Sequence, residues 1–338
     1  MNEEKMLYHV SGAPFVRSKT DTQRIMLDVL IALLPAFCVS VWQFGVQAII
    51  RVVVSVASCV FFEWAYRKLM KKDSTIHDLS ACVTGVLMVF CMPSSVPLWM
   101  IVWAALFAIV LVKQLFGGIG KNFLNPALAG RAVLLASYAG TMTSWVDPAA
   151  GKAAIIGSNA DVVTTATPLA IMKTGDFAEL MATYGVDKMF IGQIPGSLGE
   201  VSAVALLIGG AYLIWRKVIN WQTPVAYIAT VAVLTFLFPK QGTGLEWMLY
   251  SVFGGGLFLG AFFMATDYAT SPVTKKGQLI FGIGCGLFTV LIRYFGSYNE
   301  GVCYSIMVMN LCVALIDKYT KPTRFGVVKS DKKEAAAK

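Results

Sequence analysis

The chain has 338 residues, of which 57% are hydrophobic and only 14% are charged, and its mean hydropathy is +0.67. Soluble domains carry about 25% charged residues, so this composition argues against an ordinary soluble domain. A net charge of +9 would suggest a nucleic-acid partner if the chain were soluble. The positions of the basic residues, described below, give a different explanation.

Apolar segments long enough to cross a bilayer recur along the chain. They predict an all-α polytopic membrane protein with about ten transmembrane helices. The predicted spans are residues 25–45, 47–66, 78–92, 97–116, 125–140, 199–215, 222–238, 246–264, 277–296 and 300–317. The third and fifth spans are short, which favours tilted, broken or partly re-entrant segments.

These spans divide the chain into five predicted parts. The parts are a cytoplasmic N-terminal segment (1–24), a first five-helix membrane repeat (25–140), an extracytoplasmic loop (141–198), a second five-helix repeat (199–317) and a cytoplasmic tail (318–338). The loop is polar and rich in Ser, Thr and Gly, unlike the rest of the chain. Long loops of this kind in compact proteins are usually functional or disordered.

Basic residues follow the alternation of the spans. If the chain starts inside, the cytoplasmic segments hold 22 of the 28 Lys and Arg residues. The basic residues of the outer segments are Lys152, Lys173, Lys188, Lys240 and Arg293. This asymmetry satisfies the positive-inside rule, so both termini are predicted to be cytoplasmic and the loop to lie outside. The excess of Lys and Arg in the cytoplasmic segments therefore explains the net positive charge, so membrane lipid is an expected partner and a nucleic-acid partner is not needed.

The two halves show weak internal similarity. The stretch MPSSVPLWM followed by GIGKNFLNPALAG resembles DYATSPVTKKG followed by GSYNEGVCYS, which pairs spans three to five with spans eight to ten. An odd offset inverts the second copy, as in transporter repeats, and we favour this inverted 5+5 arrangement. A rival alignment pairs Pro93 and Pro126 with Pro239 and Pro272, shifts by four spans and keeps the copies parallel. The sequence alone does not decide between them.

Metal and disulfide chemistry are not expected. The seven cysteines all fall in apolar segments and none forms a C-x-x-C pair. Neither a disulfide framework nor a zinc site fits this distribution. The cysteines are interpreted as small apolar packing residues, with ligation of a cluster shared with a partner subunit as the alternative. No NAD site is visible in the sequence.

The loop contains the run DVVTTATPLA, which fits the pattern D-x-x-[S/T]-x-A-T. The fixed positions are Asp161, Thr164, Ala166 and Thr167, with Thr165 between them. The run resembles the flavinylation motif of the membrane subunits of bacterial redox pumps, in which a flavin transferase joins FMN by its phosphate to the last threonine hydroxyl. The resemblance therefore implies covalent FMN at Thr167. An ordinary turn or a helix N-cap is the alternative.

The resemblance extends along nearly the whole chain, from about residue 5 to 320. TDTQRIMLDVLIALLPA (20–36), GGIGKNFLNPALAGRA (117–132) and LGAFFMATDYATSPVT (259–274) look like the first-span entry, fifth-span motif and eighth-span end of the NqrB/RnfD family. Length and the short N-terminal segment are closer to the Rnf branch. Thr165 departs from the family, where many relatives have glycine.

The family resemblance implies a non-autonomous subunit of a complex in the bacterial cytoplasmic (inner) membrane. The Rnf complex moves electrons between reduced ferredoxin and NAD⁺ and couples this flow to Na⁺ or H⁺ translocation. The chain would relay electrons through FMN on Thr167. Its implied partners are the A, B, C, E and G subunits, above all the flavin-bearing G subunit, and the flavin transferase. A second, noncovalent riboflavin and a fold similar to that of urea transporters are also implied.

Several polar residues in or near the spans are candidates for an ion path. They are Asp28 in the first span, Asn125 at the start of the fifth, and Asp267 and Thr270 after the eighth, where the backbone is expected to leave the helix before Pro272. Charges inside a bilayer are costly and often functional, and broken helices offer carbonyl oxygens to cations. The alternative for Asp28 is a position at the lipid headgroups. The alternative for the other three residues is a structural turn.

Glu63 and Arg51, near the ends of the second span, are interpreted as interfacial anchors. The competing hypothesis for the whole chain is a channel or transporter for a small solute, with the same helical fold and no redox role. The flavin motif is what favours the redox interpretation. The sequence does not decide the coupling ion, the second flavin site or the flavin potential.

Overall fold

The computed structural model describes residues 21–146, 165–175, 177–200 and 202–322. Within these ranges the regular elements are helices, and an isolated antiparallel bridge joins Pro93 to Ser197. The N-terminal segment up to residue 20, the tail from residue 323 and part of the loop lie outside the described residues.

Every predicted span overlaps a helix. The helices of the first half are α1 (Thr22–Phe44), α2 (Val46–Leu69), the 3-10 turn η1 (Ile76–Asp78), α3 (Ser80–Phe90), α4 (Leu98–Leu106) with the π-helix η2 (Phe107–Gln114), α5 (Pro126–Ser137) and α6 (Ala139–Met142). The loop contributes α8 (Pro168–Thr174), α9 (Phe177–Thr183) and α10 (Val186–Ile191). The second half holds α11 (Ala203–Trp215), α12 (Gln222–Leu237), α13 (Gly244–Phe253), α14 (Leu257–Leu259) with the π-helix η3 (Gly260–Met264), α15 (Lys275–Phe295) and α16 (Val302–Thr320).

Length and composition identify the helices that can cross a membrane. Among the described residues α1, α2, α15 and α16 are long and apolar enough, and the bent pair of α13 with α14–η3 would make a fifth span. The remaining apolar helices have 10–17 residues. The all-helical membrane class is therefore confirmed, whereas ten crossings and the 5+5 repeat stay predictions.

The predicted eighth span, 246–264, is not one straight helix. Its two parts meet at an angle of 63°. Three consecutive glycines, Gly254 to Gly256, separate them, and Gly255 has a φ of +71°. Only glycine adopts this left-handed backbone at little cost, so the three glycines end α13 and let the chain restart in a new direction.

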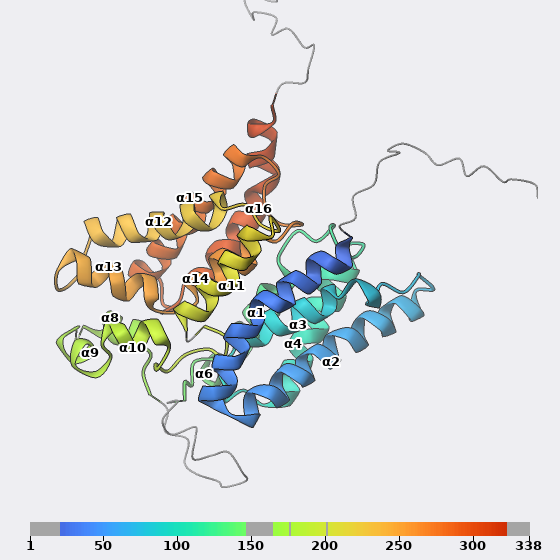
Figure 1. Cartoon of the computed structure of the whole chain (residues 1–338). Helices are drawn as coiled ribbons and strands as arrows, with labels where there is room; N and C mark the ends of the chain where they lie inside the picture. Colours follow the sequence, from blue (N-terminus) through green and yellow to red (C-terminus); the bar gives the residue numbers. More distant parts are fainter. Residues whose placement is uncertain (1–20, 147–164, 176, 201, 323–338) are drawn as a thin grey trace, which may run out of the picture.

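The two halves form two adjoining groups of helices (Figure 1). Helices α1 to α6, coloured blue to green, lie on the right, and α11 to α16, coloured yellow to red, lie above and to the left. The start of α1 and the end of α16 lie at the upper side, and α8 to α10 lie at the lower left. The start of α1 and the end of α16 thus lie away from α8 to α10. The membrane side that the two chain ends and the loop face stays a prediction.

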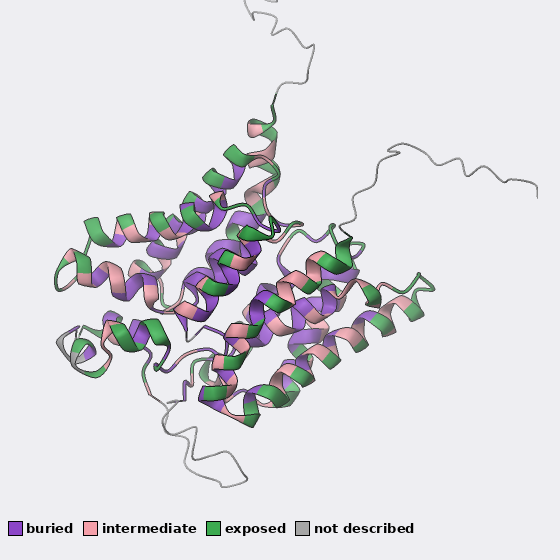
Figure 2. Ribbon diagram, in the orientation of Figure 1, coloured by how far each residue is buried: buried purple, intermediate pink, exposed green. Residues whose placement is uncertain are grey.

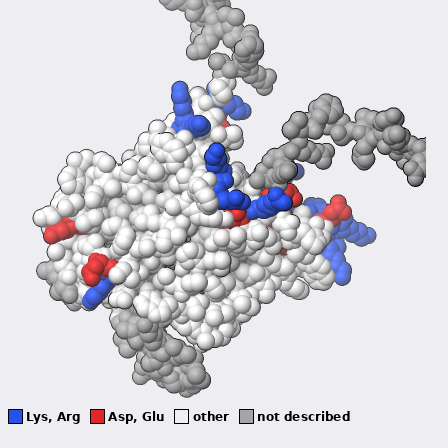
Figure 3. Space-filling model, in the orientation of Figure 1, with Lys and Arg blue, Asp and Glu red and all other residues white. Residues whose placement is uncertain are grey.

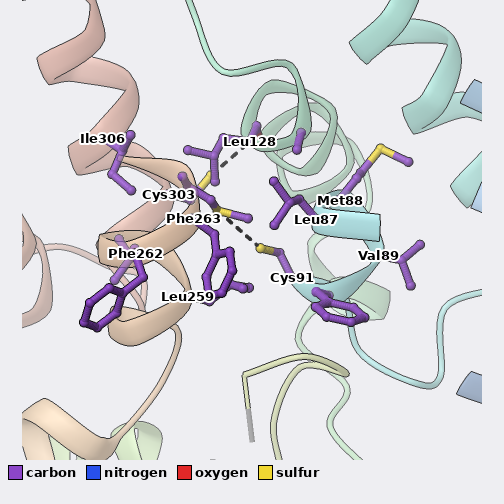
Figure 4. Close-up of a cluster of buried hydrophobic side chains, with 14 of the residues drawn as sticks. Leu87, Met88, Val89, Cys91, Leu128, Leu259, Phe262, Phe263, Cys303 and Ile306 are labelled. Atoms are coloured by element: carbon purple, nitrogen blue, oxygen red, sulfur yellow. Dashed lines mark hydrogen bonds between the residues drawn. The ribbon is translucent and has the colours of Figure 1, made fainter. Parts of the chain in front are cut away.

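The halves meet in a shared apolar core. Figure 4 shows Leu87 and Cys91 near the end of α3 facing Phe263 of η3 and Cys303 of α16. The Cys91 Sγ lies 3.8 Å from the Met264 Sδ, and the Cys303 thiol lies 3.5 Å from the Leu128 carbonyl oxygen of α5. Because the interior packs densely, this core fixes how the two halves sit against each other.

Helices α1 and α11 cross at very short range. A Cβ atom on Gly209 would clash with the Ala32 carbonyl oxygen of α1. Small residues allow this kind of close approach between membrane helices. Farther along the same contact, the Tyr212 hydroxyl donates to Asp28 Oδ1 at 3.0 Å, which fixes the register of the pair.

The outer faces of the long helices are apolar. Figure 2 shows buried residues gathered toward the centre and exposed ones on the outward sides of α1 and α2. Exposed side chains there include Leu34, Val53 and Phe61. On the face shown in Figure 3 charged atoms gather near the ends, and a broad uncharged surface lies between them. Such a surface suits lipid rather than water, so the chain is a multi-pass membrane protein.

A triangle of buried hydroxyls ties α12, α15 and α16 together. The Tyr227 hydroxyl lies 2.6 Å from Thr289 Oγ1 and 2.9 Å from Ser305 Oγ, and the last two lie 2.8 Å apart. Tyr227, Thr289 and Ser305 are each fully buried. Interhelical hydrogen bonds of this kind stabilise membrane helices modestly.

We expect Tyr227→Phe to destabilise the protein by about 1 kcal/mol. The variant loses the two hydrogen bonds of the Tyr227 hydroxyl, whereas the hydrogen bond between Thr289 and Ser305 remains. The measurement is the thermal unfolding midpoint of the purified full-length protein in one detergent. Tyr138→Phe is the matched control, since Tyr138 is 42% exposed. Equal midpoints for the two variants would contradict the role of the triangle.

Candidate functional site

Thr167 is the N-cap of α8. Its backbone is extended (φ −68°, ψ 155°), its Oγ1 accepts a hydrogen bond from the Ala170 N–H at 3.2 Å, and Pro168 is the first helical residue. The residue is only 6% exposed. The helix N-cap alternative is therefore confirmed, and Thr167 belongs to the packed part of the loop.

The other motif residues are placed only in part. Asp161 and Thr164 lie outside the described residues. Thr165 is half-buried and its N–H donates to the Trp145 carbonyl oxygen at 3.0 Å, whereas Ala166 is exposed. Ala166 is thus the point where the described part of the motif reaches the surface.

Two small cavities flank Thr167. One of about 10 Å³ is lined by Thr167, Glu200 and Glu300, and one of about 40 Å³ by Thr167, Arg131 and Glu300. Ligand pockets usually enclose about 300–1,000 Å³, so neither holds a flavin ring. The Thr167 hydroxyl itself fits a phosphoester, because its cap uses an oxygen lone pair and not the hydroxyl proton. A flavin attached there would lie on the surface toward Ala166.

A buried ion pair lies beside Thr167. Arg131 of α5 and Glu300, in the turn before α16, approach to 2.6 Å. Glu200 lines the first small cavity, and its buried Oε2 lacks a hydrogen-bond partner among the described residues. A buried pair is costly to break, so Arg131 and Glu300 fix the halves where Thr167 packs. Sequence reasoning missed both residues; the signal was a single Arg inside an apolar run, GRAVLLA.

The two predicted helix breaks meet in space. Asn125 caps α5, with its Oδ1 accepting from the Ala127 N–H at 3.0 Å, and its Nδ2 donates to the Met264 carbonyl oxygen at the end of η3 at 3.3 Å. In the amide orientation that satisfies its neighbours, Asn310 of α16 donates to the Thr270 carbonyl oxygen at 3.0 Å and accepts from the Asn125 N–H at 3.2 Å. The prediction that the backbone leaves the helix before Pro272 is confirmed.

Asp267 lies in the same break and accepts from Thr270 Oγ1 at 3.2 Å. Asp28 lies elsewhere, because it pairs with Arg216 at 3.2 Å and accepts from Tyr212. The structure thus brings Asn125, Asp267 and Thr270 together and leaves Asp28 outside the group. Ion conduction by any of them stays a prediction.

A larger cavity of about 310 Å³ opens beside this break. Its walls are mainly apolar and come from α1, α3, α5, the end of α11 and the segment from Phe262 to Ala269. The polar residues that line it are Thr22, Ser80, Thr84, Lys113, Asn122, Asn125, Thr266 and Asp267. An apolar cavity of this size with a few polar groups is typical of a small-molecule site.

Lys113 forms a buried ion pair at one edge of the cavity. Its Nζ lies 2.8 Å from Glu63 Oε2 and 2.6 Å from Ser80 Oγ, and Thr75 Oγ1 donates to Glu63 Oε1 at 2.6 Å. The Lys113 and Glu63 side chains are 3% and 1% exposed. The interpretation of Glu63 as an interfacial anchor is therefore wrong. Lys113, 50 positions away, gives the carboxylate a buried partner that the sequence did not reveal.

We expect Glu63→Ala to lower stability strongly, by about 3–5 kcal/mol, because it leaves the Lys113 ammonium buried without a counter-charge. The double variant Glu63→Met with Lys113→Met removes both charges and is expected to lose much less. Thermal unfolding in a single detergent compares them. Arg216→Ala, which breaks a half-exposed pair, serves as the control for loss of a charge. A double variant as unstable as Glu63→Ala would argue against this account.

Comparison with known proteins places these features in one family. The sequence model of the "NQR2, RnfD, RnfE family" matches residues 9–326. The chain is 48% identical over 337 residues, all of both chains, to the D subunit of the Na(+)-translocating ferredoxin:NAD(+) oxidoreductase complex of Acetobacterium woodii. It is 41% identical over 329 residues (96% of this chain, 97% of the relative) to the D subunit of the proton-translocating ferredoxin:NAD(+) oxidoreductase complex of Clostridium ljungdahlii.

Proposed function

Because the chain belongs to the NQR2, RnfD, RnfE family, we propose that it is a membrane subunit of an Rnf-type ion-translocating complex that relays electrons through FMN on Thr167. The observation that carries the proposal is the place of Thr167. The acceptor hydroxyl of the motif stands at the start of α8, beside exposed Ala166, in a loop region away from the start of α1. Two similar proteins named as D subunits support the complex.

The proposal includes the finer organisation expected from the sequence. The chain would cross the inner membrane ten times, with both termini inside and the loop outside. The helix contacts support pairing of each span with the span five positions later. Helix α2 packs on α3 and α4, and its counterpart α12 packs on α13 and α15. Helix α1 packs on its own counterpart, α11. The remaining subunits and a flavin transferase would be its partners.

Bound FMN would supply one-electron exchange, and the residues around Thr167 would hold and orient it. Pro168 fixes the backbone at the acceptor. A phosphodiester carries a negative charge, and the charged groups beside it would be the Arg131–Glu300 ion pair and the Glu200 carboxylate. Because Thr167 is buried, the first turn of α8 would have to leave its packed position for the transferase to reach the hydroxyl.

We expect wild-type protein, made with its flavin transferase, to give a fluorescent band on a denaturing gel, and Thr167→Ala to give a dark one. Thr165→Ala is the control, since it removes the neighbouring hydroxyl and spares the acceptor. A dark wild-type band beside a bright, known flavinylated protein would sink the covalent assignment and favour the solute-channel hypothesis.

We also propose that the cavity of about 310 Å³ holds the second, noncovalent flavin implied by the family resemblance. Its apolar walls suit a flat ring, and Lys113, Asn125 and Asp267 offer polar partners. The neighbouring break, with Asn125, Asp267 and Thr270, is a candidate part of the ion path. The two similar proteins are named for different ions, Na⁺ and H⁺, so likeness alone does not choose between them.

Val29→Trp places a large side chain in this cavity and is expected to abolish the flavin released by acid extraction. The covalent fluorescence on a denaturing gel should remain. Val53→Trp, on the exposed face of α2, is the matched control. Unchanged release of flavin from Val29→Trp would place the second flavin elsewhere.

A further inference from the structure

Three of the basic residues that the charge pattern assigns to the outer side meet in the structure. Lys173 lies on α8, Lys240 follows α12 and Arg293 lies on α15, yet all three line one cavity of about 30 Å³. The flavin assignment does not use them. A convergence of cations from distant parts of the chain, on the side where basic residues are sparse, calls for an anion.

Neutral carbonyl oxygens are the partners of these cations. Lys173 Nζ donates to the Gly296 and Tyr298 carbonyls at 2.5 and 3.2 Å, and Lys240 Nζ donates to the Tyr294 carbonyl at 2.8 Å. The Arg293 guanidinium donates to the Ser251 and Gly254 carbonyls at 2.5 and 3.2 Å. Each of these contacts satisfies hydrogen bonds without cancelling charge.

The positive charge exceeds what the helix end can balance. The ion pairs within the described residues join Lys113 to Glu63, Arg131 to Glu300 and Arg216 to Asp28, and none includes this group. The carbonyls at the end of α15 act as about half a negative charge. The Glu200 and Glu300 carboxylates also act on Arg293, but Glu300 is paired with Arg131, so an excess of positive charge remains. Burial and the neighbouring Lys240 ammonium lower the pKa of Lys173, which agrees with an excess of positive charge.

Arg293 supplies a second, independent sign of a missing partner. Its side chain is buried, at 8% exposure, and its Nε finds no hydrogen-bond acceptor in the described part of the chain. An unpaired buried donor is costly, and an acceptor within hydrogen-bond distance of Nε would remove that cost. A cavity of 30 Å³ has room for a few oxygen atoms but not for a large ligand.

The surroundings of the cavity are those of a lipid-facing surface. At the adjoining ends of α12 and α15 the side chains of Phe236, Leu237, Phe238 and Phe295 are between 50% and 81% exposed. Lys240 Nζ lies 4.9 Å from the Tyr294 ring centroid and 5.9 Å from that of Phe295. The cations therefore border an exposed apolar surface, as basic residues at the level of lipid headgroups do.

We propose that Lys173, Lys240 and Arg293 bind the phosphate of an anionic phospholipid, whose acyl chains lie along the exposed ends of α12 and α15. Phosphate oxygens supply acceptors for the lysines and for the free Arg293 Nε. Basic pockets between membrane helices recognise acidic headgroups in this way. A phosphodiester on Thr167 has the same chemistry, and Thr167 lies six positions before Lys173, so the test separates the two sources.

The experiment is native mass spectrometry of the delipidated, detergent-purified full-length protein, titrated with phosphatidylglycerol and, separately, with phosphatidylcholine. Wild type is expected to bind the anionic lipid about tenfold more tightly, and Lys173→Gln with Lys240→Gln to lose most of that preference. Lys188→Gln is the matched control, because Lys188 is also assigned to the outer side but donates to the Thr183 carbonyl of the loop. Added salt should weaken the wild-type preference, which tests the idea without any variant.

Equal binding of the two lipids by wild type, or a double variant that behaves like Lys188→Gln, would overturn the proposal. The titration is repeated on flavin-free Thr167→Val and on flavinylated wild type. Similar preferences in both support the lipid. If the preference appears only in the flavin-free protein, the chain's own phosphodiester fills the site, and the lipid assignment is overturned.

Discussion

Polar backbone at a break in a membrane helix must find its hydrogen bonds within the protein, because the hydrocarbon offers none. The centre of this molecule depends on that constraint. Asn125 of the first half donates its side-chain amide to the Met264 carbonyl oxygen of the second half, and Asn310 of the second half accepts from the Asn125 N–H, so each half supplies what the break in the other lacks. The apolar core between α3 and η3, and the cavity beside the break, keep their shape because these amides hold the nonhelical segments in place.

The same constraint decides where charges lie. Glu63 and Lys113 share one edge of the large cavity, and Arg131 and Glu300 join the halves near Thr167. Each ion pair lies next to a candidate cofactor position and not within the purely apolar core. A fixed charge of either sign beside a redox group biases its chemistry, so these pairs set the electrostatic surroundings of both proposed flavins.

Much of the fold could be predicted, since apolar length and caps are local properties. The segments of α1, α2, α15 and α16 follow from hydropathy alone. Long-range pairing could not be predicted. Arg131 and Glu300 are 169 positions apart, and the local sequence around each gives no indication of its partner. Thr167 shows the limit in another way. Its sequence fits both an N-cap and a flavin acceptor, and the two uses are chemically compatible, so the pattern could not separate them.

The close crossing of α1 and α11 restricts which substitutions this chain can accept during evolution. A side chain at Gly209 would have to displace the Ala32 backbone, and no rotamer of a neighbour can make that room. Substitution at Gly209 is therefore tied to a shift of the whole first helix, including the Asp28 contact with Tyr212 and Arg216. Among relatives that keep this crossing, these positions should covary as one unit, although they stand nearly 200 residues apart in places.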